Sequence, residues 1–440
     1  MRKKFNIIII VMDSTRARNL SCYGYSRKTT PNIDKLSKEA IFCKNAISTS
    51  NWTLPSIASF FTGLYPFQHR ILNEFHKLSD SDKHKTLAEI LKSKGYETVS
   101  FSSNGWISKY FGFDKGFEHF YEIDKYTFPK NKILRYIEYF KAALSLRDYG
   151  GETINKAVIS YFSKRKNPNK PIFLFIHYVG PHHPYNPKRP FHRKFSKIYP
   201  WDIITINKQI YNNLYPNYYK GVWKPPESQL EKIRDLYDGE IAYLDYIIHQ
   251  LIENLQNFID IDKTIIVITA DHGECLGESR ELKIIGHQIG LYDDLIRVPL
   301  IFKHPEIGRT VIQTQIQLTD IYHSIVDILN GRHPLIIRKD EISDNSNYAF
   351  AEYYPPPHLL RKMEGVDKKY IDPRICVRTN DYKLIYAQSC KEFYDLTNDP
   401  LETKNIYSNN RIVSSLEKEL RRFSGHEKMK IREVVRSLGL

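Results

Sequence analysis

Cysteine is scarce in this sequence, and the few cysteines form no recognisable pattern. The 440 residues include five cysteines, at positions 22, 43, 275, 376 and 390. An odd number without regular spacing is typical neither of a disulfide framework nor of a structural zinc site. We therefore expect reduced thiols and a cytoplasmic protein.

Long apolar runs are also missing. No segment approaches the roughly 20 apolar residues of a transmembrane helix. Residues 7–12 follow Arg2, Lys3 and Lys4 as in a secretion signal, but this apolar run is too short and no small-residue cleavage site follows it. We therefore expect neither a membrane span nor a signal peptide.

Motifs for nucleic-acid binding, internal repeats and low-complexity segments are absent too. Without a zinc finger or an RNP motif, nucleic acid is not the expected partner, although the formal net charge is +15. A positive charge of this size also suits an anionic membrane surface or a small anionic substrate. Lysine is abundant throughout the chain, so part of the charge belongs to an ordinary solvated surface.

Two apolar runs end in residues that can bind a metal ion. Residues 264–268 are β-branched and predict a buried parallel strand, which leads to Asp271 and His272. Residues 5–12 predict another central strand, which ends at Asp13. Open α/β sheets bind ligands beyond the carboxyl ends of their strands. Carboxylate oxygens beside an imidazole are therefore plausible metal ligands at this edge.

Strands and helices alternate over the first three quarters of the chain. Further strands are predicted at 96–101 and 171–176, and helices at 85–94 and 228–258. This alternation predicts a doubly wound, mostly parallel sheet. Asn104 and His177 follow two of these strands, so they are further candidates to face the site.

The stretch around Thr53 is the expected start of a helix, because Pro55 and Ser56 follow and Gly63 ends the pattern. A residue there lies near the positive end of the helix dipole, where an anion is favoured. Thr53 has a structural alternative, in which its hydroxyl only caps the helix.

The sequence pattern divides the chain into two unequal parts. We predict a catalytic domain over residues 1–335, with an irregular insert at 186–226 that is rich in aromatic and basic residues and could act as a lid. Residues 336–440 predict a small subdomain with an antiparallel sheet at 348–353, 374–379, 382–386 and 392–395, and a helix at 413–422.

Several short motifs occur in a fixed order along nearly the whole chain. They lie at residues 10–13, 22–24, 30–34, 61–66, 181–185, 271–273, 286–287, 291–293, 297–299, 393–396 and 398–400. Together they resemble the sulfatase family of the alkaline phosphatase superfamily. The resemblance implies an alkaline-phosphatase-like α/β fold and cleavage or transfer of an anionic ester.

The resemblance also implies roles for individual residues. Asp13, Asp271 and His272 correspond to metal ligands, and Thr53 to the nucleophile, which would also contact the metal. His182 and His287 correspond to histidines that hold the substrate oxyanion, and we expect Asn104 to contact the substrate as well. The implied cofactor is one divalent ion: Mn²⁺, Zn²⁺, Mg²⁺ or Ca²⁺.

The sequence departs from the sulfatase pattern at three positions. The nucleophile of a sulfatase is formylglycine, made from Cys or Ser, and threonine cannot become that aldehyde. Ile57 stands where sulfatases have an arginine, and Ser14 replaces a second aspartate ligand. The remaining set resembles threonine-dependent phosphoglycerol and phosphoethanolamine transferases of the same superfamily. It favours phosphoester chemistry on a glycan or lipid head group.

Two alternatives remain from the sequence. One is a true sulfatase that uses unmodified Thr53, and the other is an inactive member that only binds an anionic glycan. The sequence decides neither between hydrolysis and transfer nor on the oligomeric state.

Overall fold

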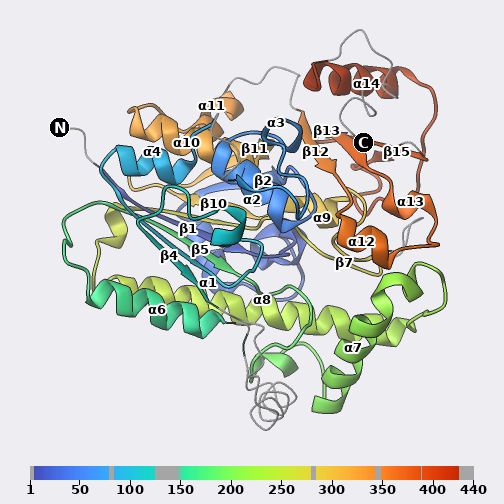
Figure 1. Cartoon of the computed structure of the whole chain (residues 1–440), viewed down its shortest axis with the longest axis horizontal. Coiled ribbons are helices and arrows are strands. Elements are labelled where there is room, and N and C mark those ends of the chain that lie inside the picture. The colour runs from blue at the N-terminus through green and yellow to red at the C-terminus, as the bar shows by residue number, and fades with distance from the viewer. Residues whose placement is uncertain are drawn as a thin grey trace.

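The computed structural model describes residues 4–78, 84–123, 148, 150–278, 284–341, 348–387 and 389–425. Its centre is a large, mostly parallel sheet, which confirms the predicted fold class (Figure 1). In spatial order the strands are β11 (Thr310–Gln317), β2 (Ile41–Ile47), β10 (Leu300–Lys303), β6 (Thr264–Thr269), β1 (Asn6–Met12), β5 (Ile172–Tyr178), β3 (Glu97–Ser102) and β4 (His119–Glu122). The short β9 (Arg297–Val298) pairs with β2, and β9 and β10 run antiparallel to their neighbours.

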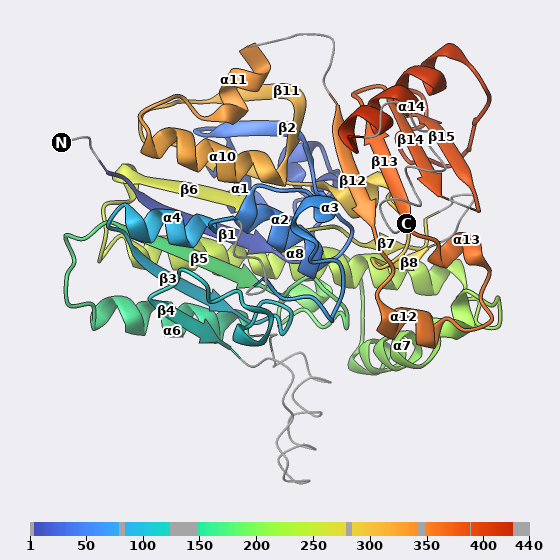
Figure 2. The same cartoon turned by 45° about the horizontal axis from the view of Figure 1, so that its top comes forward.

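Helices cover both faces of this sheet (Figure 2). One layer holds α1 (Pro31–Ser37), α6 (Gly151–Ser163) and α8 (Glu227–Leu255), and the other holds α2 (Thr53–Thr62), α4 (Leu87–Ser93) and α10 (Leu318–Leu329).

The residues of β1 show why both faces are covered. Ile8 and Ile10 pack with the core that contains α8, whereas Ile7, Ile9 and Val11 pack with the core that contains α2. Successive side chains of a strand point to opposite faces, so an uninterrupted apolar run needs a cover on each side.

Segment 186–226 is more regular than the sequence suggested. It contains α7 (Pro200–Asn213), followed by a π-helical turn, η6 (Leu214–Tyr218). Ile203, Ile206 and Ile210 are buried along one face of α7, and Pro200 occupies its first turn. The expectation of an irregular insert was therefore wrong for residues 200–213. The aromatic and basic residues of this segment made the helical spacing of its isoleucines difficult to recognise in the sequence.

The C-terminal part is a four-stranded antiparallel sheet with helices. The strands are β12 (Ala349–Tyr353), β13 (Arg374–Arg378), β14 (Tyr382–Ala387) and β15 (Lys391–Asp395), and the helices are α12 (Pro357–Lys362), α13 (Lys368–Ile371) and α14 (Arg411–Phe423). The antiparallel sheet and the closing helix agree with the prediction, and residues 426–440 of the predicted subdomain lie outside the described residues.

Four smaller elements connect these parts. They are α3 (Pro66–His69), the β7 (Cys275–Leu276) and β8 (Ile285–Gly286) hairpin, α9 (Asp293–Ile296) and α11 (Leu335–Glu341). Helix α11 packs against α10 and β11, so it lies with the main sheet. Within the described ranges, no helix combines the length and apolar character needed to cross a bilayer.

Candidate active site

Three neighbouring strands bring three ionisable side chains together at one edge of the sheet. Asp13 follows β1 directly, Asp271 follows β6, and His177 belongs to β5, which pairs with β1 on its other side. All three side chains are fully buried, and one ligand atom from each lies within 4.8 Å of the other two. The predicted meeting of strand ends has therefore produced a compact group of two carboxylates and an imidazole.

Helix α2 begins at this group and places Thr53 against it. One turn into the helix, the Ser56 hydroxyl donates to the backbone carbonyl of Asp271 at 2.6 Å, which ties α2 to the end of β6. The Thr53 oxygen lies 3.3 Å from Nε2 of His272 and 3.4 Å from the amide nitrogen of Asn104. Trp52 occupies the N-cap position, so Thr53 does not have the capping role considered as its alternative.

His272 faces both carboxylates. Its Nε2 lies 3.4 Å from Oδ1 of Asp13 and 3.6 Å from Oδ2 of Asp271. Its Nδ1 donates to the carbonyl of Gly273 at 2.8 Å, which leaves Nε2 as the atom directed at the site. A Cβ on Gly273 would come within 2.0 Å of the carbonyl oxygen of Asp294, so glycine permits this close approach.

Asp13 is held by two donors. The side-chain amide of Asn104 donates to its Oδ2 at 2.6 Å, and the Ser14 hydroxyl donates to its Oδ1 at 2.9 Å. Asn104 was predicted to contact the substrate, and here it bonds to Asp13 and lies beside Thr53. Ser14 has a positive φ of 56°, and its backbone N–H lies 3.3 Å from Oδ1 of Asp271.

A second group, made of three histidines, borders the first. His182 and His183 follow β5, and His287 follows β8; one ring nitrogen from each lies within 4.8 Å of the others. The rings of His272 and His287 stack with their centroids 4.5 Å apart. The structure thus brings His182 and His287 to the side of the Thr53 group, as the sequence resemblance implied.

The buried side chain of Glu274 orients His287 in this second group. Its Oε2 lies 3.2 Å from Nδ1 of His287 and 3.9 Å from Nδ1 of His183. Nδ1 of His182 donates to the carbonyl of His183 at 2.5 Å. Contacts at Nδ1 fix how the rings are turned, as in sites where a carboxylate orients a histidine.

Asp271 in the first group and Glu274 in the second are ionised at neutral pH. Burial alone would raise the pKa of Asp271, but His272 and His177 outweigh it and hold the pKa well below its usual range. Burial likewise opposes ionisation of Glu274, but His287 and His183 lower its pKa to about 2. Burial lowers the pKa of His287, although Glu274 opposes the shift. Burial opposes protonation of His272, but Asp271 and Asp13 outweigh it and raise the pKa of this imidazole, which partly offsets the negative charge of the centre.

These residues fit a divalent cation. Oδ2 of Asp271 and both ring nitrogens of His177 are buried without a hydrogen-bond partner among the described residues. Two adjacent ligands of one ion with bonds of about 2.0–2.1 Å lie roughly 3.3 Å apart. Nε2 of His272 lies 3.3–3.6 Å from one oxygen each of Thr53, Asp13 and Asp271, and these three distances are close to that value.

His183 and Glu274 were not identified from the sequence. The sequence offered one indication of a role for these residues, which is that His183 lies next to His182 and Glu274 lies two residues after His272. This closeness in sequence did not suffice to assign a role, because only the fold brings residues 183, 274 and 287 together. His177 had been considered as a strand-end residue, but without an assigned role.

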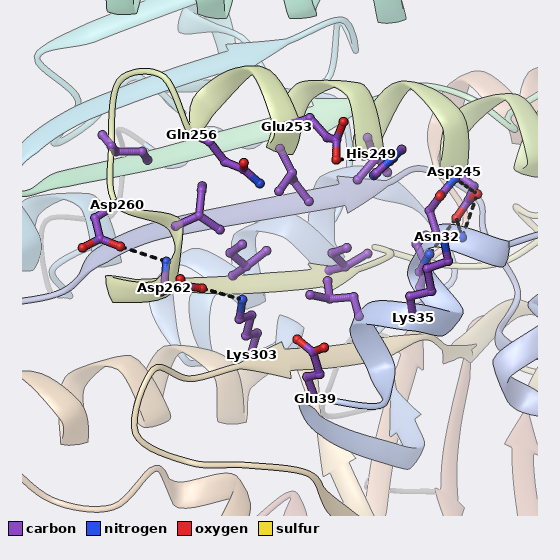
Figure 3. Close-up of a pocket in the computed structure, with 18 residues that line it drawn as sticks. Asn32, Lys35, Glu39, Asp245, His249, Glu253, Gln256, Asp260, Asp262 and Lys303 are labelled. Carbon is purple, nitrogen blue, oxygen red and sulfur yellow. Dashed lines mark hydrogen bonds and ion pairs between the residues drawn. The ribbon is translucent and has the colours of Figure 1, made fainter.

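A cavity elsewhere in the protein is structural (Figure 3). It has a volume of about 470 Å³ between α1 and α8, and none of the residues of the two groups lines it. Asp245 in its wall accepts the backbone N–H of Ile33 at 2.8 Å, and Lys303 pairs with Asp262. These polar side chains thus have structural partners already.

Known proteins share sequence and fold with this chain. Bovine arylsulfatase K (Bos taurus) is 23% identical over 96% of this chain and 82% of its own length. The structure of a protein in complex with its substrate D-glucosamine-2-N,6-O-disulfate has a TM-score of 0.72 at 19% identity, with 97% of this chain and 98% of that chain covered. The phosphonate monoester hydrolase of Agrobacterium radiobacter has a TM-score of 0.72 at 18% identity, with 99% and 96% covered.

The two solved structures share the fold, and the family assignment comes from family models. The model described as N-sulphoglucosamine sulphohydrolase, C-terminal, matches residues 288–426. The sulfatase model matches residues 5–331, which include Asp13, Thr53, His182, Asp271 and His287. This match spans well over half of the 440 residues, and the chain therefore belongs to the sulfatase family.

Proposed function

We propose that the protein is a metal-dependent hydrolase or transferase that acts on anionic esters through a covalent ester on Thr53, with phosphoesters as the preferred substrates. The observation that carries the proposal is the position of the Thr53 hydroxyl, 3.3 Å from His272 and on the first turn of α2. A hydroxyl there adjoins both the carboxylates and the histidine group.

In this proposal Asp13, Thr53, Asp271 and His272 hold one divalent ion, such as Mn²⁺, Zn²⁺, Mg²⁺ or Ca²⁺. When bound, the ion lowers the pKa of the coordinated hydroxyl and offsets charge on the transferring group. Ser14 stands in place of a second carboxylate, which weakens a Ca²⁺ site, since Ca²⁺ takes six to eight oxygen ligands.

The side chains then divide the reaction into two steps. The Thr53 hydroxyl loses its proton to solvent and its oxygen attacks phosphorus, the bond to the leaving oxygen breaks, and His182 or His287 provides the proton that the leaving alcohol needs. In the second step, water or an acceptor alcohol attacks the phosphoryl-Thr53 ester and passes its proton to the same histidine, the bond between phosphorus and the Thr53 oxygen breaks, and that oxygen takes a proton from solvent.

The contact with Glu274 suits His287 to hold an oxyanion or to donate a proton. It faces Nδ1 of the ring, so it stabilises the imidazolium that forms when an anionic substrate oxygen approaches the other nitrogen. His182 would hold the same oxyanion from the neighbouring loop. These contacts support binding of an anion rather than of a neutral ester.

The substrate class follows from the charge of the protein and from its relatives. A net charge of +15 favours an anionic ester, such as one on a glycan or a lipid head group, and no nucleic-acid motif is present. A phosphonate monoester hydrolase shares the fold, which supports phosphorus chemistry on this scaffold.

Sulfate-ester hydrolysis is the second candidate. Arylsulfatase K is a relative, and one solved structure with the same fold holds a disulfated glucosamine. Thr53 would then act without formylglycine. An inactive glycan-binding member is disfavoured, because Asp13, Thr53, Asp271 and His272 all meet in one buried centre.

Matched substrates test the choice. Purified protein loaded with Mn²⁺ or Zn²⁺ is assayed on one aryl leaving group presented as a phosphodiester, a phosphomonoester and a sulfate ester. We expect the highest kcat/KM on a phosphoester. A clear preference for the sulfate ester would instead establish the second candidate.

A further inference from the structure

His177 lies at the centre of the candidate site, yet neither of its ring nitrogens has a hydrogen-bond partner in the part of the chain that is described. Its side chain is 0% exposed, so these atoms are out of reach of bulk solvent. A buried polar group left unpaired costs about 1–3 kcal/mol. Such an atom in a well-packed protein needs an explanation, and a missing ligand is one of them.

The strand places this ring on the side of α2. Phe173 and Phe175 of β5 belong to the core that contains α2, and side chains two residues apart share a face. His177 therefore points to the side on which α2 begins with Thr53. In the parallel ladder His177 pairs with Val11, two residues before Asp13.

The distances around the ring suit a shared ion better than direct hydrogen bonds. Nε2 of His177 lies 3.6 Å from Oδ2 of Asp271 and 4.0 Å from Oδ2 of Asp13. Both separations exceed a hydrogen bond, and Oδ2 of Asp271 is itself unpaired among the described residues. Two ligands of one ion are about 3.3 Å apart when adjacent and about 4.2 Å apart when opposite, and both distances lie in this range.

We propose that His177 is an additional ligand of the divalent ion, and that it takes the place of the carboxylate that Ser14 cannot provide. The inference rests on the proposed function, because it concerns the same ion. Ser14 has no carboxylate and uses its hydroxyl to donate to Asp13, whereas Nε2 of His177 on the neighbouring strand faces both Asp13 and Asp271.

A second imidazole changes which ion the site selects. Two histidines, His177 and His272, with two carboxylates and a hydroxyl form a mixed nitrogen and oxygen set. Imidazole suits Zn²⁺ and other transition metals, whereas Mg²⁺ and Ca²⁺ prefer oxygen ligands. We therefore expect Zn²⁺ and Mn²⁺ to displace Mg²⁺ and Ca²⁺ from the protein.

A purely structural role makes a different prediction. A protonated His177 could neutralise Asp271 without touching the ion, and its removal would then also disturb the site. The number of imidazoles bound to the ion separates the two roles, since only a ligand contributes to that number.

The experiment counts these imidazoles by pulsed EPR on full-length protein loaded with Mn²⁺, with ¹⁴N- or ¹⁵N-histidine. We expect two coordinated imidazoles in the wild type and one in His177→Gln and His177→Ala. The affinity for Mn²⁺ should fall at least about 10-fold in both variants, the lower end of what is lost with an outer-shell partner.

Two other histidine substitutions serve as controls. His69 is buried and lies 3.0 Å from the Ser59 hydroxyl, so His69→Gln removes a buried imidazole with an unrelated partner. His287→Ala removes a histidine that adjoins the site without being a proposed ligand. Both should keep two coordinated imidazoles.

The outcomes separate the two proposals. One coordinated imidazole in the wild type, or two in a folded His177→Gln variant, would overturn the role of His177 and leave the proposed function intact. If neither His177 variant folds, the count in the wild type and in His287→Ala decides. Wild-type protein that binds no Mn²⁺ or Zn²⁺ would instead refute the proposed function.

Discussion

Two buried groups of charged side chains differ in how completely their charges are paired. In the C-terminal sheet, the Lys383 amine lies 2.6 Å from Asp293 and 2.7 Å from Glu402, and the Arg378 guanidinium lies 2.8 Å from Asp293. In the candidate active site, Asp13 and Asp271 face imidazoles, and Oδ2 of Asp271 and both ring nitrogens of His177 lack hydrogen-bond partners among the described residues. We call the first group closed, because its charged side chains are paired with Lys or Arg. We call the second group open, because its carboxylates face imidazoles and some of its polar atoms have no partner among the described residues.

The difference shows what each group does. Charges that are buried with good partners hold two parts of a fold in one arrangement, and the loss of one partner leaves the other unpaired. Asp293 belongs to α9 of the main domain and Lys383 to β14, so this group joins the two parts. In the open group the carboxylates face His272 and His177 instead of Lys or Arg. This arrangement suits the group to the divalent ion proposed above.

The largest effect should come from the open group. Thr53→Ala removes the nucleophile, and turnover should fall by at least about 1,000-fold, because water does not readily replace an activated nucleophile. Intact mass measured during turnover should show a covalent adduct on the wild type and none on the variant.

Thr62→Ala is the matched control for this substitution. Thr62 is buried on the same helix, but its hydroxyl donates to the carbonyl of Ala58. Turnover of this variant should stay within a few-fold of the wild type. An adduct that persists in Thr53→Ala would place the nucleophile at another residue.

The next effect contrasts the two groups by stability, measured in urea on metal-free protein. Asp293→Asn leaves Lys383 and Arg378 short of a partner and should lower the free energy of unfolding by about 3–5 kcal/mol. Asp271→Asn removes a carboxylate whose low pKa means that its charge is stabilised in the folded protein, but His272, unlike Lys383 and Arg378, can release its proton when it loses this partner, so the loss should be smaller, about 1–2 kcal/mol. Equal losses in the two variants would contradict the distinction between a closed and an open group.

The sequence was informative where local rules suffice. The apolar runs before Asp13 and Asp271 fixed two strands, and the order of parallel strands predicts that their ends meet. Thr53 required the family resemblance, because a threonine before Pro55 is equally compatible with a helix cap.

What the sequence could not show are contacts between distant segments. Glu274 orients His287 across a hairpin, and His177 reaches Asp271 from another strand; both depend on side-chain packing that no spacing reveals. Helix α7 was missed for a different reason. Ile203, Ile206 and Ile210 repeat at helical spacing, but the large aromatic residues Trp201 and Tyr211 are exposed on the same helix. Because of them, the solvent face does not look polar in the sequence, and the helical pattern was not recognised.

The smallest effect concerns a buried carboxylate that belongs to neither group. Glu240 on α8 accepts the backbone N–H of Asn186 at 2.8 Å, on the segment that follows His182 and His183. No described cation contacts it, and burial raises its pKa from 4.5 to about 8. It therefore shows what happens to an acid that has neither the closed network of Asp293 nor the histidines around Asp271.

The direction in which Glu240 changes the free energy of unfolding with pH follows from the difference between its pKa in the folded and in the unfolded protein. Between about pH 4.5 and pH 8 the folded protein keeps a proton on Glu240 that the unfolded chain has released, so this group makes folding less favourable as the pH rises through that window. Glu240→Gln cannot ionise. Relative to the wild type, the variant should therefore gain on the order of 1–3 kcal/mol of unfolding free energy between pH 5 and pH 8. Urea titrations at both pH values measure this, with Glu231→Gln, an exposed position on the same helix, as the control. A stability difference that is the same at both pH values would mean that Glu240 titrates in the folded protein as it does in the unfolded chain.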